Sequence, residues 1–266
     1  FFTVQDEGFR TAIDDAISAG VVAPWDAKAI YLKEGVLSND HGRNRFVGKP
    51  RMNSLVKYWA QGLDVALGRH VTSVFESDKW ALKFEDGSIV EGFDGVISTL
   101  PPAQAKNILP DSFSGVQSVL SSKMHVCFCA MVGLDAPIDL GWDTLRVKGL
   151  PIDWISINNT KPGRSESVGT VVIHSEAAWS NTHAGADQEW VKMVMLDSAS
   201  ALMGISLARQ PHVALHRWLY ASSKSSPNVP CIGENGFVVA GDWCLGGRVQ
   251  SAWTSGRAAA KFLLEK

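Results

Sequence analysis

The sequence predicts an α+β chain built around a mixed, mainly antiparallel sheet. Residues 116–220 hold several apolar stretches of strand length that are rich in β-branched residues. Asp86-Gly87 separates two alternating stretches and is a strong hairpin signal, because both residues tolerate a positive φ. A third observation is the apolar run Phe237 to Ala240, which stops at a glycine and leads into a helix.

The first part of the chain predicts short helices and a small meander. Apolar residues at helical spacing begin at Phe9, and Gly20 and Pro24 then end the helix. The expected elements, in order, are a helix over 9–17, polar turns over 26–45, a loop over 48–52 with a helix that ends near Gly62, a three-stranded meander over 69–91, a strand over 93–98 and a brief helix over 105–108.

The middle of the chain predicts long strands and one amphipathic helix. Asp187 is a plausible N-cap for this helix, because its carboxylate can accept a hydrogen bond from a first-turn N–H. The residues expected on its apolar side are Trp190, Val191, Val194, Ala201 and Leu202. The strands expected around it cover 124–132, 152–157, 170–174 and 213–220, and a Ser/Pro/Asn-rich loop follows at 222–230.

The strand that ends at Ala240 is followed by Gly241-Asp242, a glycine pair and a helix. Unpaired N–H groups and the positive end of the helix dipole make such a connection a ready site for an anion or an electron-rich carbonyl. The alternative is an ordinary strand–helix connection in which Asp242 caps the local turn. The residues expected on the buried face of the helix are Val249, Ala252, Trp253, Gly256, Ala260 and Leu263.

Composition excludes several classes of function. A chain of 266 residues with 45% hydrophobic residues can bury a core, and its net charge of −2 gives no reason to expect a nucleic-acid or membrane partner. The longest apolar runs are too short to span a membrane. The four cysteines form no CxxC pair, which favours free thiols and a cytoplasmic location. The histidines show no metal-ligand spacing, so no metal site is expected.

The run GDW…GGRV…A…SG…AA within residues 241–260 resembles the C-terminal flavin-binding signature of the FAD-dependent amine oxidase superfamily, especially its renalase-like branch. Further segments resemble that branch in the same order along the chain. They are FFTVQDEGF with GVVAPW, FVGKPRMNSL, PIDWISINNTKPGR, HSEAAWSNTH and HRWLYA. The resemblance implies a partial FAD-binding domain over 46–100 and 232–266, into which a substrate domain, formed by 1–45 and 101–231, is inserted.

The dinucleotide fingerprint of such proteins is missing from this sequence. No two glycines stand two residues apart, so GxGxxG occurs nowhere in the chain. The chain also has no initiator methionine. We therefore expect a truncated product that lacks the family's first βαβ unit and retains only a remnant of the α/β domain.

The resemblance also implies roles for individual residues. For the non-covalent FAD of the intact protein, the implied contacts are Val71, Gly241, Asp242, Arg248, Val249 and Gln250. Aromatic walls stack well on a flat ring such as nicotinamide, and the residues expected in a substrate pocket are Trp154, His174, Trp218 and Trp243. No catalytic residue is identified. His216 is a weak candidate, since a lone strand histidine is more often a hydrogen-bonded core group.

Two classes of function remain open at this point. The first is an FAD-dependent oxidoreductase, either renalase-like, with hydride transfer from a dihydronicotinamide-type substrate and oxygen as acceptor, or an amine oxidase. The second is a non-catalytic substrate-domain core that binds no flavin. The expected partners are a small-molecule substrate and, through an exposed sheet edge, a second copy of the chain.

Overall fold

The computed structural model describes residues 1–40 and 44–265, and its backbone divides into two compact units. Unit 1 consists of Phe1–Trp59 and His125–Ala221, and unit 2 consists of Ala60–Met124 and Ser222–Lys266. Both units are discontinuous in sequence, as the expected domain plan is. The compact units change at 59/60 and 124/125 rather than at the expected 45/46 and 100/101. The assignment of one part to flavin and the other to substrate stays a prediction.

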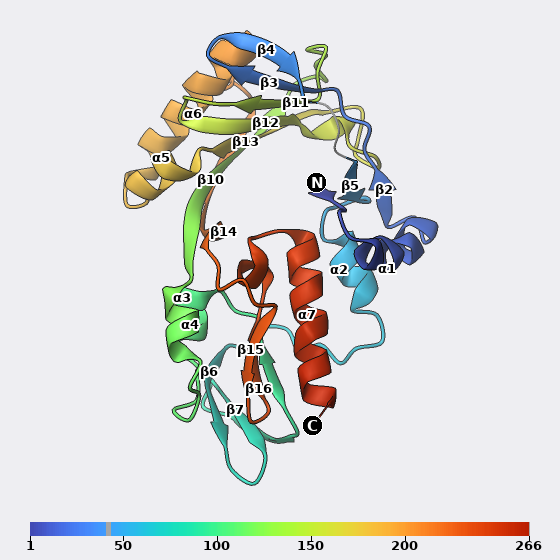
Figure 1. Cartoon of the computed structure of the whole chain (residues 1–266). Coiled ribbons are helices and arrows are strands. Elements are labelled where there is room, and N and C mark those ends of the chain that lie inside the picture. The colour runs from blue at the N-terminus through green and yellow to red at the C-terminus, as the bar shows by residue number, and fades with distance from the viewer. Residues whose placement is uncertain (41–43, 266) are drawn as a thin grey trace. The chain divides into compact units, whose positions relative to one another are not determined.

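The main feature of unit 1 is a seven-stranded sheet in the order β14-β10-β13-β12-β11-β3-β4 (Figure 1). The strands are β3 (Ala29–Lys33), β4 (Val36–Asn39), β10 (Lys123–Leu134), β11 (Thr144–Val147), β12 (Ile152–Ile157), β13 (Gly169–Ser175) and β14 (His212–Ser225). The pairs β10–β13, β13–β12, β12–β11 and β3–β4 are antiparallel, and β11–β3 is parallel. The predicted mixed, mainly antiparallel sheet is confirmed.

The central strands of this sheet alternate between an apolar face and a polar, aromatic face. Helices α5 (Ala177–Thr182) and α6 (Gln188–Met203) lie on the apolar face (Figure 1), and Val191 and Met195 of α6 pack against Ile155 and Ile173. The opposite face carries one row of partners in register across five strands. That row is Tyr31, Arg146, Trp154, His174 and Cys129. Because side chains alternate along a strand, this row lies on the face away from α6.

The remainder of unit 1 is a small sheet with two helices. Strands β1 (Phe2–Thr3), β5 (Arg45–Gly48) and β2 (Val22–Pro24) pair antiparallel in the order β1-β5-β2. Helix α1 (Glu7–Ser18) is capped by Asp6, which accepts the Phe9 N–H, and it buries Phe9 and Ile13. The second helix is α2 (Ser54–Trp59). Both helices confirm the predicted ones.

Unit 2 contains the predicted meander and the predicted strand–helix connection. Strands β6 (Val71–Glu76), β7 (Trp80–Phe84) and β8 (Ile89–Phe93) form the antiparallel meander. A second sheet has the order β15-β16-β9, with β15 (Cys231–Glu234), β16 (Phe237–Ala240) and β9 (Val96–Ser98). The strands expected over 93–98 and 237–240 both form, and β9 and β16 are parallel neighbours.

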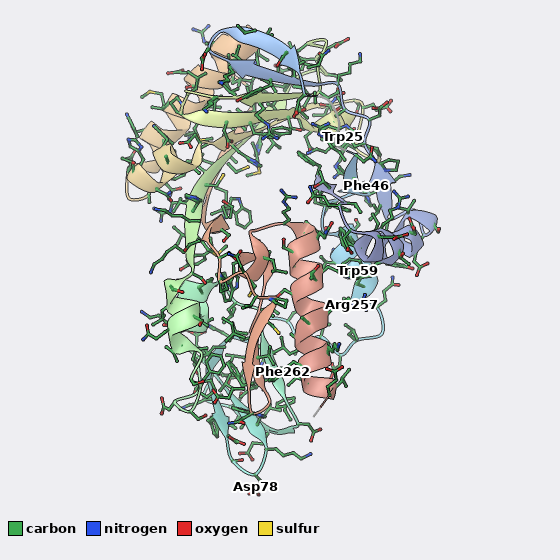
Figure 2. All side chains as sticks on the ribbon, viewed as in Figure 1. Trp25, Phe46, Trp59, Asp78, Arg257 and Phe262 are labelled. Carbon is green, nitrogen blue, oxygen red and sulfur yellow. The ribbon has the colours of Figure 1, made fainter. Side chains whose placement is uncertain are left out.

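Helix α7 (Val249–Leu264) covers this second sheet, and helices α3 (Pro102–Ala105) and α4 (Val116–Ser121) complete unit 2. The ring of Phe262, labelled in Figure 2, lies so close to β15 that a Cβ on Gly233 would come within 2.8 Å of it. The residues that α7 buries are Ser251, Ser255 and Ala259. The expected buried face was wrong, because Val249, Ala252, Gly256 and Ala260 are exposed.

Sequence periodicity missed several short elements. The polar segment 26–45 was expected to form turns, but it contains β3 and β4, which extend the seven-stranded sheet. Strands β11 and β15 and helices α4 and α5 were not expected. The strand expected over 213–220 runs on to Ser225, into the segment expected to be a loop. On α6, Val191 is buried as expected, but Trp190 is exposed.

Candidate functional site

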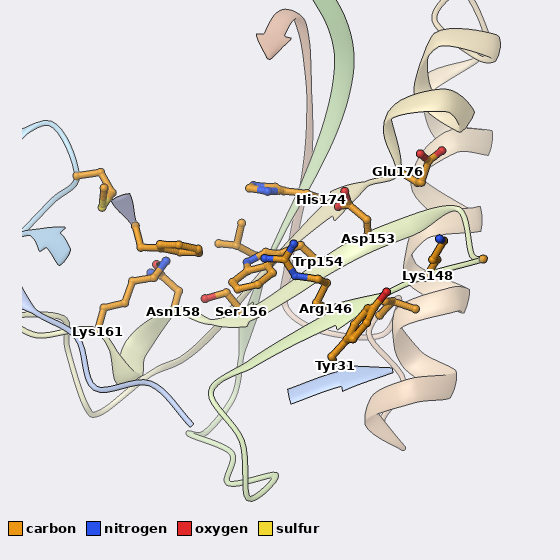
Figure 3. Close-up of a pocket in the computed structure, with 15 residues that line it drawn as sticks. Tyr31, Arg146, Lys148, Asp153, Trp154, Ser156, Asn158, Lys161, His174 and Glu176 are labelled. Atoms are coloured by element: carbon orange, nitrogen blue, oxygen red, sulfur yellow. Dashed lines mark hydrogen bonds between the residues drawn. The ribbon is translucent and has the colours of Figure 1, made fainter. Parts of the chain in front are cut away.

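A cavity of about 640 Å³ opens on the polar face of the seven-stranded sheet in unit 1 (Figure 3). Strands β3, β11, β12 and β13 form its floor, and the turn after β12 forms one end. Its polar and aromatic lining includes Arg146, Asp153, Trp154, Ser156, Lys161 and His174. All of them belong to unit 1.

Trp154 lies at the centre of this floor. Its ladder partners are Arg146 on β11 and His174 on β13, so the three side chains share one face. The Arg146 guanidinium carbon lies 5.8 Å from the centre of the indole ring. The register between β12 and β13 shifts between Ile152 and Trp154, and this bulge lets the consecutive residues Asp153 and Trp154 both line the cavity.

One end of the cavity is acidic. Burial, and next the nearby charge of Glu176, raise the pKa of Asp153 to about 6, while Arg146 opposes the shift. Glu176 is the N-cap of α5 and accepts the Trp179 N–H at 2.7 Å. Lys148 also lines the cavity near these two carboxylates, as Figure 3 shows.

The other end carries a buried lysine. A short 3₁₀ turn, η1 (Asn158–Thr160), follows β12 and places Lys161 with only 9% of its surface exposed. Its Nζ donates to Asn158 Oδ1 at 2.9 Å and lies 5.3 Å from the centre of the Trp25 ring. Burial, and next the positive charge of Arg164, lower the pKa of Lys161 to about 8.

The histidine of the floor is neutral at physiological pH. Burial, and next the charge of Lys161, lower the pKa of His174 to about 4. A neutral imidazole can donate from one ring nitrogen and accept at the other. His174 therefore offers hydrogen bonds to a ligand without adding a charge.

Three buried polar atoms near the floor have no hydrogen-bond partner among the described residues. They are Ser156 Oγ, Thr144 Oγ1 and Arg146 Nε. Thr144 and Ser156 are ladder partners on β11 and β12. Arg146 Nε does lie 3.8 Å from the Asp40 carboxylate, so its charge is partly compensated. Buried donors without acceptors are costly, and a ligand in the cavity can supply the acceptor for Ser156.

The predicted flavin loop lies in unit 2 between β16 and α7. The 3₁₀ turn η2 (Asp242–Leu245) is followed by Gly246 and Gly247, whose φ angles of 93° and 81° favour glycine. Ser255 Oγ of α7 accepts the Gly241 N–H at 2.8 Å and fixes the start of the loop. Within the described residues, the side chain of the N-cap Arg248 makes no capping hydrogen bond. Burial raises the pKa of Asp242, which is half-buried in this loop.

Unit 2 has a cavity of its own, of about 630 Å³, lined by residues of β6, β7 and β9 and by the α3 region. Val71, which was expected to contact a cofactor, lies on its wall. So does Ser98, whose hydroxyl is buried and has no partner among the described residues.

The structure brings together only two of the four residues expected in a substrate pocket. Trp154 and His174 line the cavity of unit 1 side by side. Trp218 lies on the edge strand β14 with 55% of its surface exposed, and its ring meets the weak catalytic candidate His216 at 4.3 Å. Trp243 is 1% exposed in the core of unit 2, where its Nε1 donates to Leu100 O at 3.2 Å.

Sequence reasoning missed Asp153, Ser156 and Lys161. The period of two along β12 could have placed Ser156 on the face of Trp154. The bulge that turns Asp153 toward the cavity has no comparable signal in the sequence. Among the described residues, no cluster of histidine, cysteine or carboxylate side chains could hold a metal ion, and no helix is long and apolar enough to cross a membrane.

Comparison with known proteins places these features in a family. The model of the flavin containing amine oxidoreductases matches residues 7–264. Mouse renalase is 24% identical over 226 residues, which cover 80% of this chain and 64% of renalase. A variant of putrescine oxidase has a similar fold, with a TM-score of 0.61 at 14% identity over 84% of this chain and 54% of that one. Cyclohexylamine oxidase from Brevibacterium oxydans also has a similar fold, with a TM-score of 0.58 at 14% identity over 73% of this chain and 48% of that one.

These comparisons also show how much of a relative the chain represents. It spans less than two thirds of mouse renalase and about half of each solved structure. The likeness to the solved structures is a likeness of fold, which confirms the expected α+β architecture. Because the family model matches nearly the whole sequence, this chain belongs to the family of flavin containing amine oxidoreductases.

Proposed function

We propose that this chain supplies the substrate cavity and the C-terminal flavin loop of an FAD-dependent, renalase-like oxidoreductase. Its reaction would be hydride removal from a dihydronicotinamide-type substrate, with oxygen as the final acceptor. The substrate loses a hydride, and oxygen takes up that hydride and one proton to give hydrogen peroxide. The observation that carries the proposal is the cavity on the sheet, in which Trp154 offers a flat wall between Arg146 and His174.

The residues present fit the cofactor that the family implies. Ser98 leaves a buried hydroxyl without a partner in the cavity beside Val71, and a nucleotide hydroxyl or ring nitrogen can satisfy it. Asp242 can accept a hydrogen bond from a ribityl hydroxyl. Cys244 is fully buried and its pKa is raised to about 11, chiefly by burial, so it supports non-covalent rather than thiol-linked binding.

Bound FAD would supply the two-electron acceptor. The chain's own contribution is orientation, exclusion of water and electrostatics. The first-turn N–H groups of α7, at Val249 and Gln250, can stabilise negative charge on an adjacent carbonyl, with Arg248 as a supplementary charge. Trp154 can hold a flat ring by stacking, and neutral His174 can fix its orientation through a hydrogen bond.

An amine oxidase is the second candidate. The half-buried carboxylate of Asp153, next to Glu176 and Trp154, could hold an ammonium group against an aromatic wall. The third possibility, a non-catalytic core, predicts that neither kind of ligand enters the cavity.

The test uses two small probes of similar size, N-methyl-1,4-dihydronicotinamide and benzylamine, with binding followed by ligand-observed NMR. We expect the dihydronicotinamide to bind and Trp154→Ala to abolish its binding. Trp190→Ala is the matched control, because Trp190 is partly exposed on α6, on the opposite face of the sheet. Stronger binding of benzylamine would favour the amine oxidase, and binding of neither probe would contradict both enzymatic candidates.

A further inference from the structure

The Lys161 end of the cavity is a positive region. Lys161 is buried, and within the described part of the chain its amino group donates to the side-chain oxygen of Asn158 and lies over the indole of Trp25. Among the described residues, no carboxylate lies within ion-pair distance of its Nζ. Burying an ammonium group without an anion is unfavourable, so this position calls for an anionic partner.

The groups around Lys161 add to this positive charge. Arg164 donates to the carbonyl oxygens of Gly48, Pro50 and Pro162, which leaves its charge without a carboxylate partner among the described residues. Arg45, in contrast, is paired with Asp40 at 3.1 Å. The other titratable groups facing this end are the thiol of Cys129, the imidazole of His174 and the amino group of Phe1.

Ser156 provides an independent observation at the same end. Its residue is 1% exposed, it lines the cavity, and its hydroxyl has no partner within the described part of the chain. Figure 3 shows Ser156 and Asn158 on the side of Trp154 where Lys161 lies, with Asp153, Lys148 and Glu176 on the other side. A free hydroxyl donor and a free positive charge both require an acceptor oxygen.

We infer that this end of the cavity is an anion subsite, in which Lys161 Nζ and Ser156 Oγ hold a carboxylate or phosphate oxygen of the ligand whose ring stacks on Trp154. The inference rests on the proposed function, because it takes the cavity as the substrate pocket. It adds a specificity rule to that function. A substrate should carry its negative group on the side of the ring that faces Lys161, away from Asp153 and Glu176.

The experiment titrates the full chain with phenyl phosphate by calorimetry, alongside the neutral N-methyl-1,4-dihydronicotinamide. We expect Lys161→Met to weaken phenyl phosphate binding about tenfold or more, since a charge-assisted hydrogen bond is lost. Ser156→Ala should weaken it by a smaller factor. Lys148→Met is the matched control, because it removes an exposed lysine from the acidic end of the same cavity, and it should change the affinity less than about twofold.

The pH dependence of phenyl phosphate binding distinguishes a direct charge contact by Lys161 from a purely structural role of this residue. Affinity for phenyl phosphate should fall as pH rises through about 8, where Lys161 loses its proton. The neighbouring groups titrate elsewhere, with pKa values of about 11 for Cys129, about 4 for His174 and about 5 for the Phe1 amino group. The decrease should therefore be absent in Lys161→Met.

The possible outcomes test the anion subsite and the proposed substrate cavity separately. If the neutral ring binds through Trp154 but phenyl phosphate binds no more tightly, the anion subsite is overturned and the proposed substrate cavity stands. Equal losses in Lys161→Met and Lys148→Met would also overturn the subsite. If neither probe binds, both statements fail. Thermal unfolding of Lys161→Met should show no loss of stability, because the variant removes an uncompensated buried charge.

Discussion

Asp153 holds a carboxylate in a half-buried position beside a second carboxylate. Its pKa, about 6, lies above the ordinary value of 3.8 because of burial first and the charge of Glu176 second. Between these two pH values the folded chain binds more protons than the unfolded chain. Stability therefore falls as pH rises from 3.8 to about 6, and the loss is complete above about 6.

The first prediction follows from this titration. Asp153→Asn should stabilise the protein near pH 8 by at most about 3 kcal/mol, because one pKa unit corresponds to about 1.4 kcal/mol. Near pH 4 the same substitution should have little effect. Urea unfolding of both proteins at the two pH values measures the difference. The exposed Asp197 on α6 gives a control, Asp197→Asn, and an equal gain at both pH values for Asp153→Asn would contradict the assignment.

Single residues of the site were predictable only where the strand pattern is regular. Trp154 and His174 belong to strands that the sequence predicted, and as ladder partners they lie side by side on one face of the sheet. Lys161 belongs to a turn, where no periodicity assigns a face. Trp243 shows the opposite error. It was expected in the aromatic wall of a pocket, but its ring packs in the core of unit 2.

Helix α7 shows why an apolar pattern alone can select the wrong face. Its buried positions are two serines and an alanine, and Ala259 packs against Val238 and Ala240 of β16. Ser255 is buried by hydrogen bonding rather than by hydrophobicity. Its hydroxyl accepts the Gly241 N–H and donates to Pro230 O at 2.5 Å. A hydropathy pattern assigns such a serine to solvent.

A pair of substitutions in α7 tests this account. Ser255→Ala should destabilise the protein by about 1–3 kcal/mol, since it leaves a buried N–H and a buried carbonyl without partners. Gly256→Ala should stabilise it by about 0.5–1 kcal/mol, because a Cβ there meets nothing within 4 Å and the helix gains propensity. Thermal unfolding of both variants measures whether stability falls in the first and rises in the second. If stability changed in the same direction in both, the assignment of the hydrogen-bonded face would be wrong.

Helix α6 depends on its N-cap in a way that the sequence predicted. Asp187 Oδ1 accepts the Trp190 N–H at 2.9 Å, and the helix covers the apolar face of the seven-stranded sheet. Asp187→Ala should therefore cost about 0.5–2 kcal/mol. Asp197→Ala, in the same helix and exposed, should change stability by less than about 0.5 kcal/mol. A melting temperature of Asp187→Ala equal to that of the control would contradict the capping role.

At the scale of the whole molecule, the sequence predicted the long strands better than the short ones. The main strands and the meander form as expected. The hairpin of β3 and β4 was not predicted, because its two short apolar runs are half-buried or exposed and polar, turn-forming residues surround them. It joins the sheet through the parallel β11–β3 pair, a contact between residues more than 100 positions apart that local patterns cannot encode.

The last prediction concerns residues 1–266 as a purified protein. The sequence contains no GxGxxG, the glycine pattern that brings a pyrophosphate close to a helix N-terminus. Strand β9, within the described sheet, pairs only with β16, and its other edge is open beside the apolar wall of the unit 2 cavity. We expect the protein to be isolated without FAD, to be inactive as an oxidase and to self-associate through this edge. Absorption spectroscopy, a peroxide assay and light scattering measure the three properties. Stoichiometric yellow flavin after purification would contradict the first, and a monomer at micromolar concentration would contradict the third.

Added FAD should bind weakly, and Asp242→Ala should weaken that binding by a further 1.5–3 kcal/mol or so, the range for a hydrogen bond to a charged group.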